Sequence, residues 1–385
     1  MTRLLGLTWD HPRATDGLYA ATAAFRRANP GIDVRWETHP LRGFESTPIE
    51  ELAARYDLIV LDHPFMGDVA SSGCLLDLSA DGARLGLDDL RADTVGRSFA
   101  TYAYGGHWAV PIDAACQIAV YRADRIAALG AVPPRRWREV EALAARGRVA
   151  VALKNVHALM TFFTMCSNLG AVPSSRRGLP LVDHAAGQVA LARLRALHAW
   201  CPDALSWNAI DLHEAMAAPG DLVYCPYVYG YVPYARPAGG RAALAFADIP
   251  SADDSGSCRG STIGGTGLAI SRRCAAPDAA LRLAAFLVRP DTQLQTGLDG
   301  GQPARRSAWR DDRLNAASGD FFRATLATME AAAIRPRYRG YMTLQNEGGE
   351  IVGQHLRGEA AAADVLASLD RLHHHLLAQA EPVHG

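Results

Sequence analysis

The sequence has 385 residues, which is long enough for two or three domains. Apolar residues make up 49% and charged residues 21%, as in globular proteins, so a disordered chain is excluded. With a net charge of -1, the chain has no overall positive charge that would attract the phosphate backbone of a nucleic acid. No apolar run is long enough to span a membrane. We therefore expect a folded protein with no nucleic-acid partner and no membrane insertion.

The first part of the chain alternates predicted strands and helices. Residues 4–8 form an apolar strand, and residues 15–28 have apolar side chains at helical spacing. Residues 32–36 alternate apolar and polar side chains, residues 48–55 form a short helix, and residues 57–61 are continuously apolar. This order of strands and helices predicts a parallel sheet that is covered by helices.

The rest of the chain continues with strands, helices and two unusual loops. Residues 224–234 contain five of the 12 tyrosines together with two prolines and a glycine, which exclude one regular helix. Residues 257–265 are rich in Gly, Ser and Thr and precede a predicted strand at 267–271. Further strands are predicted at 116–121, 149–153 and 221–224, and further helices at 137–145, 157–169, 184–200, 209–217, 278–287, 319–333, 347–357 and 361–377.

The N-terminus and the cysteines bear on the cellular compartment. Met1 leads into the first strand without an apolar signal segment before it. The seven cysteines have irregular spacing and no CxxC motif, which is typical of buried thiols in a reducing compartment. We expect a cytoplasmic protein as the sequence stands, and a periplasmic one if a leader has been removed.

Four phrases of the sequence, taken in order, resemble those of a known family. They are Phe25 followed by Asn29-Pro30-Gly31-Ile32, residues 56–62 followed by 73–78, residues 105–113, and residues 264–271 followed by 301–305. Together they resemble the extracellular solute-binding proteins of ABC transporters, in the sugar-binding group that includes maltose-binding protein. No single phrase is specific, but the ordered set covers essentially the whole chain.

The resemblance implies an α/β protein with the two-lobe periplasmic-binding-protein fold of type II, with a hinge and a cleft between the lobes. Lobe one would contain residues 1–110 and 250–305, and lobe two residues 111–249 and 306–385. In such proteins the ligand lies in the cleft and closure of the hinge buries it. The resemblance further implies a monomer and, for an exported chain, an ABC permease as partner.

Candidate ligand-binding residues follow the ends of predicted strands, because the carboxyl ends of parallel strands meet at one edge of a sheet. They are Trp9, Asp10, His11, Asp62, His63, Asp113 and Asn155, with Lys154 beside the last of these. The alternative role for Asp10, Asp62 and Asp113 is helix capping, and for Trp9 it is packing at the rim.

The two unusual loops supply further candidates. Tyr224, Tyr227 and Tyr229 offer flat apolar rings with hydroxyl groups, which suit sugars and other polyols, although such rings also pack between lobes. Thr262 and Gly264 lie in a loop whose backbone N–H groups suit an anion; the alternative is a tight crossing between lobes.

Two functions remain open from the sequence. The first is a binding protein that holds a carbohydrate or a sugar acid. The second is a cytoplasmic enzyme or sensor for a small hydroxylated or carboxylated substrate, in which His63, Asp113 and Lys154 carry out lyase-like or isomerase-like proton transfer. We find no standard catalytic motif, and we expect no cofactor and no metal. The run from His373 to His375 lies on a predicted helix, where the three side chains point in different directions.

Overall fold

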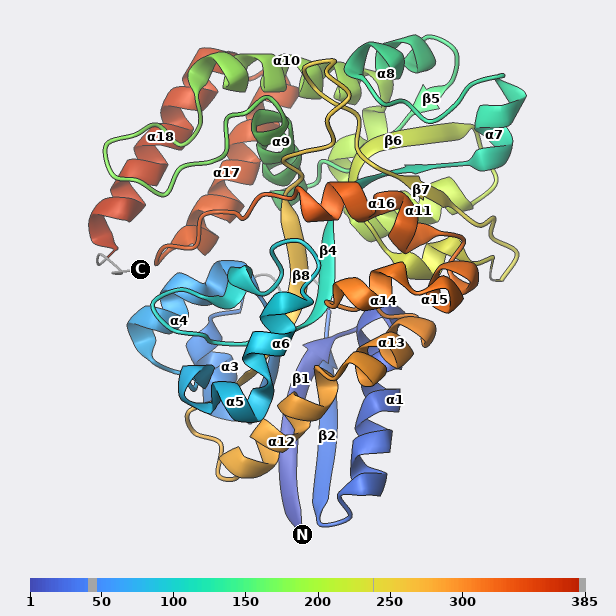
Figure 1. The fold of residues 1–385 in the computed structure, drawn as a ribbon. Helices are drawn as coiled ribbons and strands as arrows, with labels where there is room; N and C mark the ends of the chain where they lie inside the picture. The colour runs from blue at the N-terminus through green and yellow to red at the C-terminus, as the bar shows by residue number, and fades with distance from the viewer. Residues whose placement is uncertain (41–46, 238, 381–385) are drawn as a thin grey trace.

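The computed structural model describes residues 1–40, 47–237 and 239–380. Eight strands in this part of the chain form one sheet in the order β2-β1-β3-β8-β4-β6-β5, and β7 pairs with β4 (Figure 1). They are β1 (Thr2–Trp9), β2 (Ile32–His39), β3 (Leu58–Asp62), β4 (Val110–Tyr121), β5 (Arg148–Val149), β6 (Leu222–Tyr229), β7 (Ala245–Ala247) and β8 (Ile263–Ile270). β1 is parallel to β2 and β3, as the first part of the sequence predicts.

Strands β4 and β8 connect two groups of elements. The first half of β4 pairs with β8, and from Gln117 onward β4 pairs with β6 and β7. Figure 1 shows β4 and β8 running from the group around β1–β3, the first lobe, to the group around β5–β7, the second lobe. This arrangement is the two-lobe α/β fold that we expected; the residue boundaries of the lobes stay a prediction.

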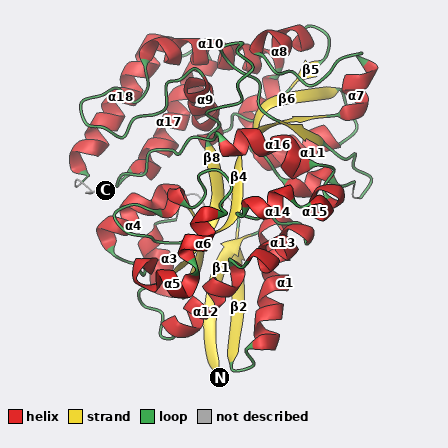
Figure 2. Cartoon of the chain, in the orientation of Figure 1, coloured by secondary structure: helices red, strands yellow, loops and turns green. Residues whose placement is uncertain are grey.

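Helices cover both groups of strands (Figure 2). Those of the first lobe are α1 (Pro12–Ala28), α3 (Ile49–Arg55), α4 (Met66–Ser72), α5 (Gly82–Leu85), α6 (Leu87–Ala92), α12 (Pro277–Leu287) and α13 (Pro290–Leu298). Those of the second lobe are α7 (Ala123–Ala128), α8 (Trp137–Ala144), α9 (Val156–Asn168), α10 (His184–Trp200), α11 (Ala209–Ala217), α16 (Phe321–Glu330), α17 (Tyr341–Leu356) and α18 (Ala362–Gln379). The short helices α14 (Arg306–Arg310) and α15 (Asp312–Ala317) lie between the lobes (Figure 1).

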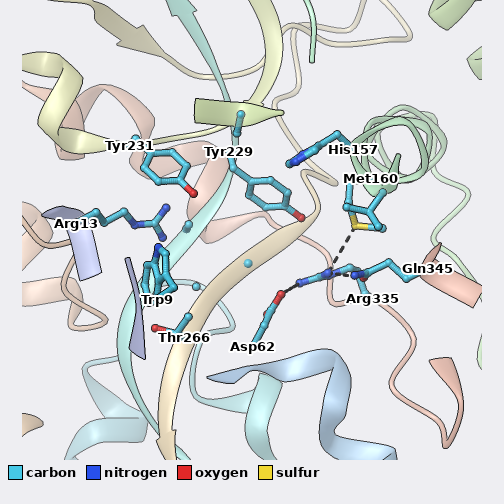
Figure 3. A pocket seen from close by; sticks show the side chains of 15 residues that line it. Trp9, Arg13, Asp62, His157, Met160, Tyr229, Tyr231, Thr266, Arg335 and Gln345 are labelled. Atoms are coloured by element: carbon cyan, nitrogen blue, oxygen red, sulfur yellow. Dashed lines mark hydrogen bonds and ion pairs between the residues drawn. The ribbon is translucent and has the colours of Figure 1, made fainter. Parts of the chain in front are cut away.

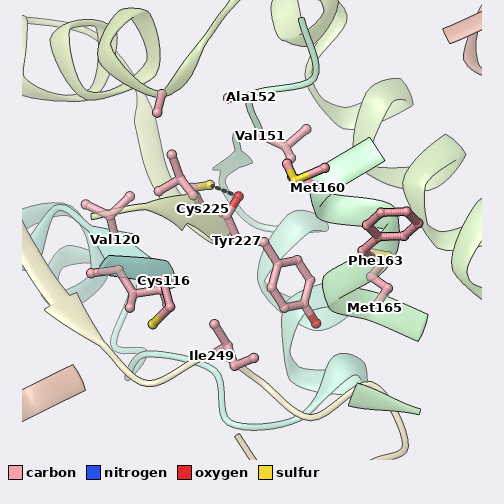
Figure 4. Packing of buried hydrophobic residues seen from close by; sticks show 14 of the residues in the cluster. Cys116, Val120, Val151, Ala152, Met160, Phe163, Met165, Cys225, Tyr227 and Ile249 are labelled. Carbon is pink, nitrogen blue, oxygen red and sulfur yellow. Dashed lines mark hydrogen bonds between the residues drawn. The ribbon is translucent and has the colours of Figure 1, made fainter. Parts of the chain in front are cut away.

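Each lobe has its own apolar core. In the first lobe, Leu58 and Val60 of β3 face one cluster and Ile59 and Leu61 face the other, so the continuously apolar run is buried on both sides of the sheet. The core of the second lobe contains Phe163 of α9 together with aliphatic, cysteine and tyrosine side chains from β4 and β6 (Figure 4). Among the described helices, none has the length and apolar character needed to cross a membrane.

One predicted strand is much shorter than expected. Of the predicted strand 149–153, only Val149 belongs to a strand, β5 (Arg148–Val149), although residues 149–153 are all buried. Ala150 still donates to the carbonyl of Tyr224, but the amide of Leu153 donates to the carbonyl of Ala204 instead of to a neighbouring strand. The chain thereby leaves the sheet just before α9 and delivers the first turn of that helix to the space between the lobes.

Candidate functional site

A cavity lies between the lobes where β4 and β8 cross (Figure 3). The space inside it, counted together with the open solvent at its mouth, is about 640 Å³. Its lining comes from eight separate stretches of the chain: Trp9 and Arg13; Asp62; Ala115; Val156, His157 and Met160; Ala209; Tyr229 and Tyr231; Gly264, Gly265 and Thr266; and Arg335 with Gln345. Both lobes contribute to it.

Three aromatic rings form part of the wall. Trp9 is the last residue of β1, Tyr229 is the last residue of β6, and Tyr231 follows two residues later. They reach the cavity because both strands end at it, and Figure 3 shows Tyr229 and Tyr231 on one side and Trp9 on the other. Flat rings of this kind pack against the C–H faces of sugar rings.

An ion pair between the buried Arg335 and the partly exposed Asp62 joins the lobes across the cavity. Asp62 Oδ2 accepts a hydrogen bond from Arg335 Nη2 at 2.6 Å, and Asp62 Oδ1 accepts one from the backbone N–H of His63 at 2.8 Å. Arg335 Nη1 donates to Gln345 Oε1 at 2.8 Å. Burial opposes the charge of Asp62, but Arg335 and His63 outweigh it, so the pKa of Asp62 lies well below its usual value. Asp62 is therefore ionised and held in one orientation.

A second ion pair lies beside Trp9. The Arg13 guanidinium donates to both carboxylate oxygens of Asp113, from Nε at 2.9 Å and from Nη2 at 2.6 Å, and its Nη1 donates to the carbonyl of Gly230 at 2.9 Å. The same guanidinium lies 4.8 Å from the ring centre of Tyr231. Arg13 thus fixes the backbone on which Tyr229 and Tyr231 stand.

The charges of the site compensate each other, and some of its polar atoms are unused. Arg13 is paired with Asp113 and Arg335 with Asp62, while burial lowers the pKa of His157 to about 4 and keeps it neutral. Within the described residues, Thr266 Oγ1 and Arg335 Nε are buried without a hydrogen-bond partner. Leaving such atoms unpaired is costly. The cavity is therefore suited to an uncharged molecule with several hydroxyl groups.

No family model and no curated protein sequence matches the chain, whereas many solved structures do. Maltose-bound MalE3 of T. maritima has a TM-score of 0.83 and 18% identity, covering 98% of this chain and 100% of that one. The GacH receptor of Streptomyces glaucescens has a TM-score of 0.83 and 17% identity, covering 99% and 100%. UgpB from Mycobacterium tuberculosis has a TM-score of 0.77 and 19% identity, covering 98% and 99%. The chain has the fold of the sugar-binding proteins of ABC transporters.

The structure brings four of the predicted site residues to the cavity. These are Trp9, Asp62, Tyr229 and Gly264. Gly264 has a packing reason to be glycine, because a Cβ there would lie 2.8 Å from Cε1 of Tyr229. All four lie at or near a strand end, which is the rule that selected Trp9 and Asp62.

Three predicted residues lie next to the cavity without lining it. His63 is fully buried, and its Nδ1 lies 2.9 Å from Asp62 Oδ1. His11 caps α1, its Nδ1 accepting from the N–H of Arg13 at 3.0 Å, and its ring packs edge-on against Tyr231. Asp113 is the partner of Arg13. These three residues contact side chains that line the cavity and hold them in place.

The remaining predicted residues lie elsewhere. Asp10, Lys154 and Asn155 are exposed. The other three are buried in the second lobe: Tyr224 is in the core, Tyr227 donates from its hydroxyl to the carbonyl of Pro250 at 3.2 Å, and Thr262 donates to the carbonyl of Met160 at 3.1 Å. Tyr224 and Tyr227 stand earlier on β6 than Tyr229, where the strand still runs through the core (Figure 4).

The residues proposed for proton transfer do not meet at the cavity. Lys154 points to solvent, His63 is enclosed behind Asp62, and Asp113 is engaged by Arg13. Burial lowers the pKa of His63 to about 4. Among the residues that the structure describes, no group of His, Cys, Asp and Glu is arranged to hold a metal ion.

Sequence reasoning missed Arg13, Arg335 and Gln345. Arg13 is one residue into a helix that begins at the strand-end loop, so a search extended by one turn would have found it. Arg335 and Gln345 carry no local signal, since Arg335 reaches Asp62 over 273 residues of sequence.

Proposed function

We propose that this protein is a solute-binding protein that holds an uncharged carbohydrate or polyol between its two lobes. The observation that carries the proposal is a buried cavity with aromatic rings on opposite walls, two compensated ion pairs and unused hydrogen-bonding atoms. Such a lining offers hydroxyl groups both donors and acceptors, and it offers sugar rings flat apolar surfaces.

An uncharged ligand is favoured over a sugar acid. A carboxylate on the ligand would need a cation that is free of its own counter-ion, and both arginines of the cavity are engaged by carboxylates. Burying an unpaired charge costs several kcal/mol. The solved structures of the same fold support a carbohydrate ligand, since MalE3 is bound to maltose and the GacH receptor was solved in complex with acarbose.

The partner follows from the compartment. We propose that the chain acts as a monomer and, where it is exported, delivers its ligand to an ABC permease. Fractionation of the native organism separates the two compartments that the sequence left open: recovery in the periplasm supports delivery to a permease, and recovery in the cytoplasm contradicts it.

A thermal-shift screen tests the binding role. The screen uses maltose, glucose and ribitol, with glucuronate as the charged counterpart of glucose. A ligand at one hundred times its dissociation constant adds about 2.7 kcal/mol of stability. For a chain of 385 residues this raises the melting temperature by about 3 °C. We expect a neutral member to produce this shift and glucuronate to produce none; the reverse order would overturn the proposed ligand class.

Two controls make the result specific. Trp9→Ala removes one aromatic wall and should abolish the shift, whereas Trp36→Ala, an aromatic residue on β2 outside the cavity, should retain it. Recovery of the sugar unchanged after long incubation, measured by NMR, separates a binding protein from an enzyme.

A further inference from the structure

Residues 335–340 form a strap that passes between the lobes. Before the strap, Ala333 exchanges backbone hydrogen bonds with Ser261 and Ile263 at the start of β8, at 2.7 and 2.9 Å. After it, α17 packs on α9 and α18. Within the strap, the buried hydroxyl of Tyr338 lies 2.9 Å from Nδ1 of His373 on α18. Figure 1 shows the segment as the connection from α16 to α17. Both ends of the strap are therefore fixed to the second lobe.

One arginine of the strap is clamped onto the first lobe. Arg337 Nη1 donates to the carbonyls of Ala100, Thr101 and Ala103 at 2.9, 2.6 and 3.1 Å, where the short 3-10 helix η3 (Ala100–Tyr102) ends. Its guanidinium also lies 5.4 Å from the ring centre of Tyr104. A cation on the carbonyls at a helix end is favourable, and the pKa of Arg337 is lowered mainly by burial.

Helix α4 of the first lobe touches the strap backbone directly. Asp68 Oδ1 accepts from the N–H of Gly340 at 2.9 Å. Gly67 lies so close that a Cβ there would overlap the carbonyl oxygen of Arg337 and the backbone nitrogen of Arg339. Gly67 is inside a helix, where alanine would be the more stable residue, so contact with the strap explains its being glycine.

We propose that residues 335–340 are an inter-lobe latch that holds the closed state through protein contacts alone. The contacts from Arg335, Arg337 and Gly340 to the first lobe join protein groups and need no ligand atom to complete them. Arg337 is a positioning residue, since it holds the segment that carries Arg335 into the cavity. The latch goes beyond the proposed function and does not depend on which ligand binds.

A methyl group added at Gly67 distinguishes a latch, which can open, from a permanent contact in the core. Gly67→Ala blocks the closed contact but favours helix α4 once the lobes part. The matched control is Gly82→Ala, also in a first-lobe helix, where a Cβ makes only ordinary contact, 3.6 Å from Leu87. Small-angle scattering of ligand-free protein measures the radius of gyration, which is about 21 Å for a compact chain of this length.

We expect the wild type and Gly82→Ala to share the compact radius, and Gly67→Ala to have a larger radius with an unchanged or higher melting temperature. A Gly67→Ala protein that keeps the compact radius and melts several degrees lower would show a permanent core contact and overturn the latch. A wild type as expanded as Gly67→Ala would overturn it as well.

A second pair of variants tests the clamp without adding bulk. Arg337→Gln removes the cation from the three carbonyls, and the control is Arg339→Gln, an exposed arginine on the same strap. We expect Arg337→Gln to expand the ligand-free protein and Arg339→Gln to leave it compact; equal radii for the two contradict the proposal. Because all samples lack ligand, a failure to bind any sugar would leave these results unaffected.

Discussion

The pair formed by Arg13 and Asp113 allows a quantitative test of how the site is built. Both side chains are almost completely buried, at 5% and 8% exposure, and they share two hydrogen bonds. Asp113→Ala leaves the Arg13 cation in the protein with only the Gly230 carbonyl and the Tyr231 ring to stabilise it. Removing one partner of a buried ion pair typically costs about 3–5 kcal/mol, because the other charge is left uncompensated.

This cost translates into a measurable change in melting temperature. A chain of 385 residues has an unfolding entropy of about 0.8 kcal/mol per degree. We therefore expect Asp113→Ala and Arg13→Met each to lower the melting temperature by about 4–6 °C. The double variant Arg13→Met with Asp113→Leu replaces the pair by apolar side chains and should cost less than either single change.

The melting temperatures of the variants can be measured at pH 7 by calorimetry or circular dichroism. The reasoning is refuted if each single variant loses no more than about 1 °C, the behaviour of an exposed pair, or if the double variant loses the sum of the two. The exposed pair of Arg323 and Asp312 is the matched control, and Asp312→Ala should change the melting temperature by no more than about 1 °C.

Three further predictions concern other parts of the chain. Burial lowers the pKa of several histidines to about 4, namely His11, His63, His107, His157, His213 and His373. The unfolded chain then binds more protons than the folded one between pH 6.5 and 4, so stability is full above pH 6.5 and falls on acidification; a flat melting temperature from pH 7 to 5 would contradict this. Asn155 has φ 50° and ψ -120°, the first central position of a II′ turn, so Asn155→Gly should raise stability by about 1 kcal/mol and Asn155→Ala should not, as read by urea unfolding. Gly264→Ala should push the Tyr229 ring and weaken ligand affinity measured by calorimetry, whereas Gly31→Ala, with open space around it, should leave affinity unchanged.

Part of the site was predictable because it depends on where strands end. Trp9 and Asp62 follow runs of buried apolar residues that are readable as strands, and parallel strands place their ends together. The tyrosine loop was the right region for Tyr229, but Tyr224 and Tyr227 lie in the core, because the strand passes through the core before it reaches the cavity. Lys154 follows a predicted strand in the same way, yet the chain leaves the sheet early and turns it to solvent.

The sequence by itself determined the α/β class, the order of the elements and the resemblance to sugar-binding proteins of ABC transporters, because apolar periodicity and short phrases are local properties of a chain. Its length suggested two or three domains. Its composition and net charge excluded membrane-spanning segments and a general positive charge of the kind that binds nucleic acid. Only the tertiary structure decided which side chains share the cavity. Arg335 meets Asp62, and Arg13 meets Asp113 and Gly230, through contacts between segments that are one hundred or more residues apart. Such pairs form because β4 and β8 cross between the lobes and the strap contacts the first lobe. The resemblance implied the crossings, but no local pattern in the sequence records which side chains meet across them.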